Sequence, residues 1–345
     1  MVPFAGWEMP VQYTGIIDEH RAVREACGVF DISHMGQFFI NGPGAATWLD
    51  RLLTNQIASL EIGQAQYTFL LNEAGGVIDD LIAYRIGAED FLLIVNAAKV
   101  AEDAAWLEEH LDEGVNFADR SDRHGAIAVQ GPDSARIYEE IFEGLGAPPL
   151  PARNGVVFIP MAMDRIFVCR TGYTGEDGFE LVCPAEATPG WFHKVLSAGA
   201  RPCGLGARDS LRLEMGYPLN GSDLTPDHSP LEAGMGFAVK LGKGEFIGSA
   251  ALAKQKARGL EQRLLGFEML DRGPPPRPHY PIESGGEVVG EISSGGLSPS
   301  LGKGIGMAYL PVALAKPGTE IDIDIRGRKL KAAIVKKPFY TKPSP

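Results

Sequence analysis

The pattern of apolar and polar positions predicts a mixed sheet covered by helices over the first two thirds of the chain. Polar or glycine-containing segments separate five apolar runs of strand length, at 67–71, 77–84, 91–96, 156–159 and 165–170. Apolar positions recur at helical spacing in three segments, at about 97–111, 188–198 and 206–215. Strands and helices therefore alternate here, as in an α+β arrangement.

Two segments in this region resemble each other. Each has an apolar strand, a Gly-Pro pair and an amphipathic helix that opens near the proline. The pairs are Gly42-Pro43 and Gly131-Pro132, an offset of 89 residues. This spacing predicts two similar α+β units in tandem.

The pattern changes near residue 260. Short strands and glycine turns replace helical spacing, with strands predicted at 264–269, 287–293, 303–309, 320–325 and 330–335. A small all-β domain is therefore expected at the C-terminus. We predict domains at 1–245, with two intertwined α+β subdomains, and at 260–345.

Two adjacent carboxylates, Asp79 and Asp80, stand in the second apolar run after Gly75-Gly76. Neighbouring side chains on a strand point to opposite faces, so the two residues are expected to have different roles. An inward carboxylate must be hydrogen-bonded, paired or used on a ligand. The alternative is a turn in which both aspartates cap backbone amides, and the local pattern leaves this open.

Composition excludes several classes of protein. The 345 residues are 45% hydrophobic and 22% charged, and no apolar run approaches the roughly 20 residues of a membrane span. The four cysteines lack CxxC spacing, so neither a disulfide framework nor a zinc site is predicted, and we expect a cytoplasmic protein. The seven histidines also lack metal-site spacing, and His34 is interpreted as a satisfied core residue.

The net charge of −12 argues against nucleic-acid binding. The segment from Arg326 to the end carries seven basic and no acidic residues, so the rest of the chain carries −19 (−12 minus +7). Lysines on a solvated strand edge explain this slightly better than a surface for an anionic partner does.

A second concentration of unusual residues runs from Arg170 to Leu181. Its three glycines at 172, 175 and 178 allow positive φ or close approach of the backbone to a ligand. Glu180 stands at the start of a strand, where a carboxylate suits the donor edge of a pterin or guanine. The alternative is a tight hairpin with a solvated glutamate.

A glycine-rich turn leads into a helix at 203–214. Arg208 and Arg212 share a helix face, and an arginine in the first turn suits a carboxylate or phosphate ligand. By spacing alone, an ion pair of either arginine with Asp209 or Glu214 is the better interpretation.

In this order, the motifs resemble the glycine cleavage system aminomethyltransferase (T-protein) family over nearly the whole chain. The stretches that carry the resemblance are 4–10, 30–36, 72–80, 170–180, 204–214, 225–232, 294–301 and 336–340. One departure is that the chain begins three residues before Phe4, where family members usually carry a longer segment.

The resemblance implies two tandem ferredoxin-like units that form a folate-binding domain, followed by a small β-barrel. It implies transfer of a methylene group from the aminomethyl-lipoyl arm of H-protein to tetrahydrofolate, the co-substrate. Asp80 corresponds to the catalytic carboxylate, and Glu180 and Arg208 to folate-binding residues. Further expected pocket residues are Tyr67, Tyr84, Asn96 and Tyr173, with less support for Tyr340. Asp79 is left with a structural role.

Two alternatives stay open at this point. A folate-dependent demethylase of a methylated amine or sulfonium would share the pterin site and differ in the pocket for its second substrate. A non-enzymatic folate-binding relative usually departs from the Asp-Asp and Gly-Tyr-Thr-Gly-Glu patterns, which are complete here. An unrelated nucleotide binder is disfavoured because the chain has no phosphate-loop motif.

Overall fold

The computed structural model describes residues 1–161 and 165–342, which form two compact units. Unit 1 comprises residues 1–71, 78–208 and 238–247. Unit 2 comprises residues 72–77, 209–237 and the chain from 248 onward. All seven residues predicted for the site belong to unit 1, so its internal geometry decides how they are arranged.

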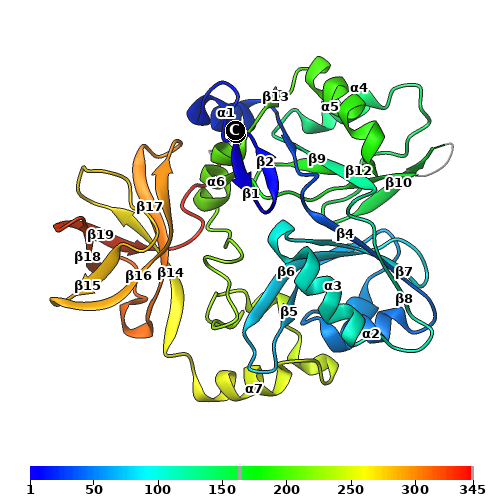
Figure 1. Cartoon of the computed structure of the whole chain (residues 1–345). Coiled ribbons are helices and arrows are strands. Elements are labelled where there is room, and N and C mark those ends of the chain that lie inside the picture. Colours follow the sequence, from blue (N-terminus) through cyan, green and yellow to red (C-terminus); the bar gives the residue numbers. More distant parts are fainter. Residues whose placement is uncertain (162–164, 343–345) are drawn as a thin grey trace. The chain divides into compact units, whose positions relative to one another are not determined.

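Unit 1 contains two sheets (Figure 1). The five-stranded sheet has the order β5 (Ala65–Leu71), β6 (Val77–Arg85), β7 (Asp90–Val95), β4 (Gly36–Asn41) and β8 (Asn116–Asp119). The six-stranded sheet has the order β10 (Val156–Pro160), β11 (Arg165–Cys169), β12 (Gly178–Pro184), β9 (His124–Gln130), β3 (Gly28–Asp31) and β13 (Arg201–Pro202). The short β13 runs parallel to β3, whereas β9, β10, β11 and β12 pair antiparallel.

Each sheet buries one face under helices. Trp48 and Leu49 of α2 (Ala45–Leu52) and Leu107 of α3 (Val100–Glu109) belong to the core of the five-stranded sheet. Ile137 of α4 (Ser134–Ile141) and Val195 of α5 (Thr188–Ser197) do the same for the six-stranded sheet. Helix amphipathicity therefore accounts for both helix-covered faces.

The opposite faces of the two sheets pack against each other. Tyr84 and Leu92 of the five-stranded sheet share one buried cluster with Phe167 and Val182 of the six-stranded sheet. We call this cluster the intersheet seam. Apolar side chains on both faces explain why these strands read as nearly continuous apolar runs.

The predicted strand–turn–helix repeat is present in both halves of unit 1. Gly42 and Gly131 have φ of 116° and 137° and lie two residues before Gly44 and Asp133, the caps of α2 and α4. A Cβ on Gly42 would lie 2.2 Å from the carbonyl oxygen of Gly114, and one on Gly131 would lie 2.4 Å from that of Ala26. Both positions thus require glycine for positive φ and for a close backbone approach.

Unit 2 contains a closed six-stranded barrel. Its order is β14 (Gln262–Met269), β17 (Lys303–Pro311), β16 (Glu287–Ser298), β15 (Pro281–Ser284), β18 (Glu320–Ile325) and β19 (Arg328–Val335), with β19 pairing back to β14. Alternate residues such as Ile321, Ile323 and Ile325 fill the interior. In the basic segment, β19 pairs with β18 over residues 328–333 and with β14 over residues 332–335. Lys331 pairs with Asp322 of the adjacent strand β18, and Lys329 pairs with Glu283 of β15. The solvated strand edge stays a prediction for this segment.

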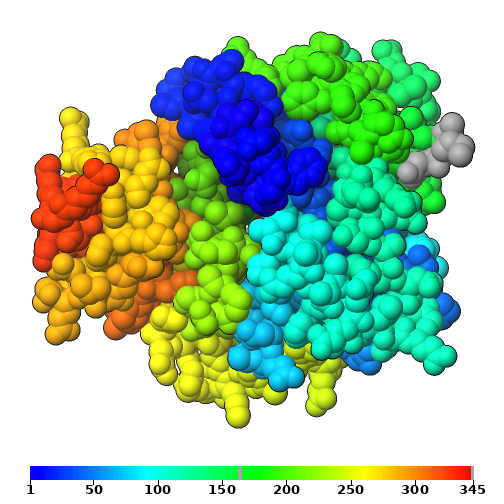
Figure 2. All heavy atoms as spheres, viewed as in Figure 1, coloured from blue at the N-terminus to red at the C-terminus, as the bar shows by residue number. Residues whose placement is uncertain are grey.

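The remaining elements are short. They are β1 (Val2–Phe4), β2 (Trp7–Met9), α1 (Ile16–Glu25), α6 (Leu205–Glu214), α7 (Ser249–Arg258) and the 3-10 helices at 57–59, 97–99, 185–187, 236–238, 241–243 and 312–314. The β1–β2 hairpin, dark blue in Figure 2, lies on the surface of unit 1, and Trp7 is largely exposed. Among the described residues, no helix combines the length and the apolar character needed to cross a membrane.

Candidate active site

The adjacent carboxylates Asp79 and Asp80 point to opposite faces of β6. Asp79 is fully buried on the face that carries Leu81 and Ala83 toward the helices. Asp80 is half-buried on the face that carries Tyr84 into the intersheet seam. Strand alternation therefore separates the two side chains as predicted.

The alternative that both aspartates cap a turn is wrong. Asn72 serves the turn instead: its backbone N–H donates to the carbonyl oxygen of Gly76 at 3.0 Å, and its Oδ1 accepts from the Gly76 N–H at 2.9 Å. Both aspartates lie beyond this turn, within β6. The Asp79 carboxylate accepts from the backbone N–H of Asn96, which follows β7.

Asp80 is held by two neutral donors. The Tyr67 hydroxyl donates to Asp80 Oδ2 at 2.7 Å, and Asn96 Nδ2 donates to Asp80 Oδ1 at 2.9 Å. Tyr67 lies on β5, and Asn96 follows β7, so the two strands beside β6 supply the donors. Burial and the Asp80 charge raise the pKa of Tyr67, which keeps its hydroxyl protonated as a donor.

Asn96 also binds Asp79. Its Nδ2 donates to Asp79 Oδ1 at 2.8 Å and its backbone N–H donates to Asp79 Oδ2 at 3.0 Å. The amide of Asn96 therefore bridges the two adjacent carboxylates. Asp79 thus holds the residue that contacts Asp80, and its structural role stays a prediction.

Glu180 lies on β12 and reaches the seam from the six-stranded sheet. The Thr171 hydroxyl donates to Glu180 Oε2 at 2.5 Å and lies 2.7 Å from the Tyr84 hydroxyl, which belongs to the other sheet. Burial raises the pKa of Glu180, while Thr171 and the Arg208 charge lower it. The alternative of a merely solvated glutamate is therefore wrong.

Arg208, in the first turn of α6, stacks over the ring of Tyr173 with its guanidinium carbon 4.8 Å from the ring centroid. The predicted ion pair holds for Arg212, which contacts Asp209 at 2.7 Å and Asp223 at 3.0 Å. It does not hold for Arg208, for which residues 1–161 and 165–342 provide no ion pair. Arg208 therefore keeps a cation beside Glu180 that no other carboxylate neutralises.

The seven predicted residues belong to one neighbourhood. Tyr173 lies close enough to Tyr67 to contribute to the raised pKa of Tyr67. Glu180 likewise contributes to the raised pKa of Tyr84. Asp80 with its donors Tyr67 and Asn96 (the Asp80 group) therefore lies across the intersheet seam from Glu180 with its donor Thr171 (the Glu180 group). Tyr340 lies in unit 2, where its backbone N–H donates to the carbonyl oxygen of Glu214.

The glycines of the 170–181 segment serve the fold of the loop. A Cβ on Gly172 would lie 2.0 Å from Gln130 Oε1, and one on Gly178 would lie 2.4 Å from the carbonyl oxygen of Val129. Gln130 Nε2 in turn donates to the carbonyl oxygen of Thr171 at 3.1 Å. The close approach at these two glycines is therefore to β9, where the sequence suggested a ligand.

Two residues near the site were not predicted from the sequence. Thr171 was quoted only as part of a motif, although it links Tyr84 to Glu180. Asp103 lies between Val100 and Leu107 on the apolar face of α3 and is fully buried. An acid at helical spacing among apolar residues was the signal that could have found it.

The interpretation of His34 as a satisfied core residue needs correction. His34 is 4% exposed, and neither ring nitrogen has a hydrogen-bond partner among the described residues. Burial and the nearby Arg208 charge lower the pKa of His34 to about 4. The ring is therefore neutral at pH 7. It is held by packing, including an edge-on contact with the Phe4 ring, whose centroid lies 5.4 Å from the His34 ring centroid.

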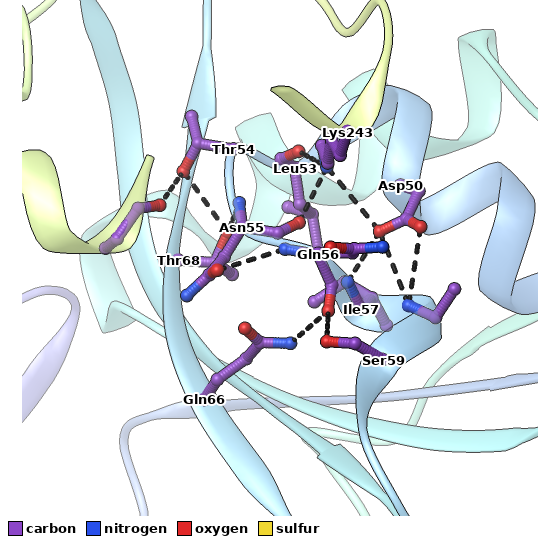
Figure 3. Close-up of polar contacts among 12 residues, drawn as sticks. Asp50, Leu53, Thr54, Asn55, Gln56, Ile57, Ser59, Gln66, Thr68 and Lys243 are labelled. Atoms are coloured by element: carbon purple, nitrogen blue, oxygen red, sulfur yellow. Dashed lines mark hydrogen bonds and ion pairs between the residues drawn. The ribbon is translucent and has the colours of Figure 1, made fainter. Parts of the chain in front are cut away.

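Lys243, another buried charged residue of unit 1, has a different environment (Figure 3). The side chain of Lys243 is 2% exposed, and its Nζ donates to the carbonyl oxygens of Leu53 at 2.5 Å and Asn55 at 2.6 Å. Asp50 Oδ1 lies 3.5 Å away. Burial lowers the pKa of Lys243 to about 8. This group, the Lys243 cluster, secures residues 238–247 to unit 1.

Comparison with known proteins identifies the family. Residues 1–243 match the model of the GCVT N-terminal domain, and residues 262–341 match that of the glycine cleavage T-protein C-terminal barrel domain. The chain belongs to the glycine cleavage T-protein family. This confirms the predicted resemblance and the predicted fold class.

Similar proteins agree over nearly the full length. An aminomethyltransferase of Symbiobacterium thermophilum is 45% identical over 356 residues, covering 99% of this chain and 94% of that protein. One of Geobacillus kaustophilus is 46% identical over 346 residues, covering 98% and 94%. The crystal structure of glycine cleavage system aminomethyltransferase T from Bartonella henselae has a TM-score of 0.92 at 34% identity, covering 99% of this chain and 94% of that chain.

Proposed function

We propose that Asp80 is the catalytic carboxylate of an aminomethyl transfer, and that Glu180 and Arg208 hold the folate beside it. The family sets the reaction: this chain is an aminomethyltransferase of the glycine cleavage system. The methylene of the aminomethyl-dihydrolipoyl arm of H-protein passes to tetrahydrofolate. The products are 5,10-methylenetetrahydrofolate, ammonia and dihydrolipoyl H-protein.

The observation that carries the role of Asp80 is its pair of donors. The Tyr67 hydroxyl donates to one carboxylate oxygen and the Asn96 amide to the other, so both oxygens are fixed in position. Such a carboxylate can accept a proton from the attacking nitrogen and stabilise positive charge while ammonia leaves. Because the group is fixed before substrate binds, little reorganisation is needed during the reaction.

The geometry of Glu180 supports pterin binding. Thr171 occupies Oε2, which leaves Oε1 for the adjacent ring N–H and amine donors of a pterin. The raised pKa of this carboxyl reflects desolvation, and donors from a ligand would favour its charged form. Tyr84, Tyr173, Tyr67 and Asn96 are proposed as walls of the same pocket, and the cation of Arg208 suits an anionic part of the folate.

Two further expectations accompany this proposal. We place the protein in the cytoplasm, where glycine cleavage would meet its lipoylated partner in a bacterial cell. The division into a folate-binding domain at 1–245 and a barrel domain at 260–345 stays a prediction. The relatives named above support the partner and the reaction rather than the compartment.

The test measures ammonia release from aminomethylated H-protein with and without tetrahydrofolate. We expect Asp80→Asn to lower the rate by about 10³-fold, within the range for general acid–base groups, and to leave the dissociation constant for tetrahydrofolate within about twofold. Asp90→Asn, an exposed aspartate of the neighbouring strand, is the matched control. Wild-type turnover by Asp80→Asn would refute the assignment. A wild-type enzyme that releases no ammonia but demethylates an amine or sulfonium would favour the demethylase instead.

A further inference from the structure

A buried carboxyl on α3 has no role in the site described so far. Asp103 is 0% exposed, and neither of its oxygens meets an N–H or O–H donor within the described part of the chain. The group in hydrogen-bonding reach is the carboxyl of Asp79, which lies across from α3 on β6. An unsatisfied ionised carboxylate at this depth would cost several kcal/mol, in the range known for unpaired buried charges.

Two carboxyl groups in contact can satisfy each other only by sharing a proton. Burial and the charge of Asp79 raise the pKa of Asp103 to about 10, and burial also raises the pKa of Asp79. The other charged groups that act on Asp103 are Glu102, which raises its pKa, and Lys99, which lowers it. One proton therefore stays on the pair at neutral pH.

The hydrogen bonds decide which residue carries that proton. Both oxygens of Asp79 already accept from Asn96, through the side-chain amide at 2.8 Å and the backbone N–H at 3.0 Å. These bonds favour the ionised form of Asp79. Asp103 accepts no such bond, so it is the neutral acid and its O–H points to Asp79.

We propose that Asp103 is a positioning residue, whose protonated carboxyl donates to Asp79 and thereby holds the Asn96 amide against Asp80. The chain of contacts runs from α3 through β6 to the end of β7 and back to the carboxylate at the seam. A reversed Asn96 amide would place its oxygen against two carboxylates. Asp79 as an ionised and fixed acceptor opposes this reversal, together with the carbonyl oxygen and Oδ1 of Asp80, each 2.9 Å from Asn96 Nδ2. The inference rests on the proposed role of Asp80.

Three variants separate positioning from packing. Asp103→Asn keeps a neutral N–H donor toward Asp79, Asp103→Leu removes the donor at similar volume, and Glu102→Gln changes the exposed acid next to it on α3. We expect Asp103→Leu to lower kcat at least tenfold with KM for tetrahydrofolate within about twofold. Asp103→Asn and Glu102→Gln should keep kcat within about twofold of wild type.

Two further measurements detect the shared proton itself. At pH 7 the infrared spectrum of the wild-type protein should contain the C=O stretch of a protonated carboxylic acid, and Asp103→Asn should lack it. The second measurement is the pH dependence of the unfolding equilibrium. Because the folded pKa is raised from 3.8 to about 10, the folded state holds one more proton than the unfolded state between these values. Wild-type stability therefore falls as pH rises, and its unfolding constant should rise about tenfold more per pH unit than that of Asp103→Asn.

Each outcome decides for or against the inference. Wild-type kcat in Asp103→Leu, a tenfold loss in Asp103→Asn, or a wild-type spectrum without the acid band would overturn it. If Asp103→Leu does not fold, the spectrum and the kcat of Asp103→Asn still decide. Failure of the proposed function is distinguishable, because an active Asp80→Asn enzyme would leave the acid band and the pH slope unchanged.

Discussion

The Lys243 cluster and the Asp80 group are two polar sites in the same unit, and they differ in what their neighbours leave available. Lys243 Nζ donates to two backbone carbonyl oxygens and lies near Asp50, so this side chain joins segments of the fold. Asp80 is half-buried, and its two carboxylate oxygens accept from the Tyr67 hydroxyl and the Asn96 amide. Glu180 across the seam has one oxygen occupied by Thr171. Burial of a charge alone therefore does not mark function, and the candidate site differs from the Lys243 cluster in having carboxylate oxygens that accept from hydroxyl and amide donors.

Removing the buried lysine is the most direct test of this difference between the two groups. Lys243→Met leaves the carbonyl oxygens of Leu53 and Asn55 without the lysine donor and removes the positive charge beside Asp50, and we expect the free energy of unfolding to fall by about 3 kcal/mol. Denaturant titration measures this, and ammonia release below the melting temperature should be unchanged. The exposed Lys240→Met is the control, with little effect on either quantity. A large loss of kcat in Lys243→Met would show that the two sites are not separate.

The opposite behaviour is expected at the other site. Asp80→Glu keeps the charge but pushes the carboxylate away from Tyr67 and Asn96, and we expect kcat to fall by about 10²-fold through misplacement. The free energy of unfolding should change little, because the carboxylate is half-buried and the substitution keeps its charge. Steady-state kinetics and thermal denaturation test the two halves of this expectation. A destabilised but fully active Asp80→Glu enzyme would contradict it.

His34 provides an intermediate case, since its ring is buried without polar partners. Its folded pKa of about 4 lies below the unfolded value of 6.5, so the unfolded state binds more protons between these values. Stability is therefore lost as pH falls through that window. Relative to His34→Leu, the wild-type protein should lose about 2 kcal/mol more between pH 7 and pH 5, from roughly 1.5 pH units of this window. Equal pH slopes in the two proteins would contradict this account.

The smallest expected effect concerns affinity. Glu180→Gln keeps one acceptor oxygen but places an amine toward a donor edge, and we expect the dissociation constant for tetrahydrofolate to rise about tenfold, or about 1.4 kcal/mol. Isothermal calorimetry measures it without the second substrate. Glu176→Gln is unsuitable as a control because Glu176 pairs with Arg24, whereas the exposed Glu186→Gln is suitable. Unchanged tetrahydrofolate binding would remove Glu180 from the pocket.

The sequence predicted the fold where periodicity is strong. The alternation along 77–84 correctly separated Asp79 from Asp80, and the Gly-Pro repeat identified the two tandem units. The ring closure of the barrel followed from the family resemblance and not from the strand lengths. Contacts between residues far apart in the sequence could not be predicted either. The spacing of Arg208 suggested an ion pair, whereas its guanidinium stacks over the ring of Tyr173. Asp103 was missed because its meaning depends on Asp79, a residue on another element.

The intersheet seam has a consequence for how this active site can change. Asp80 is anchored to one sheet and Glu180 to the other, and the Tyr84–Thr171 contact at 2.7 Å joins the two. Apolar packing of Leu92, Phe167 and Val182 therefore helps to set the distance between Asp80 and Glu180. Substitutions that change the volume of these apolar side chains are expected to change that distance, while both carboxylates stay in place on their own strands.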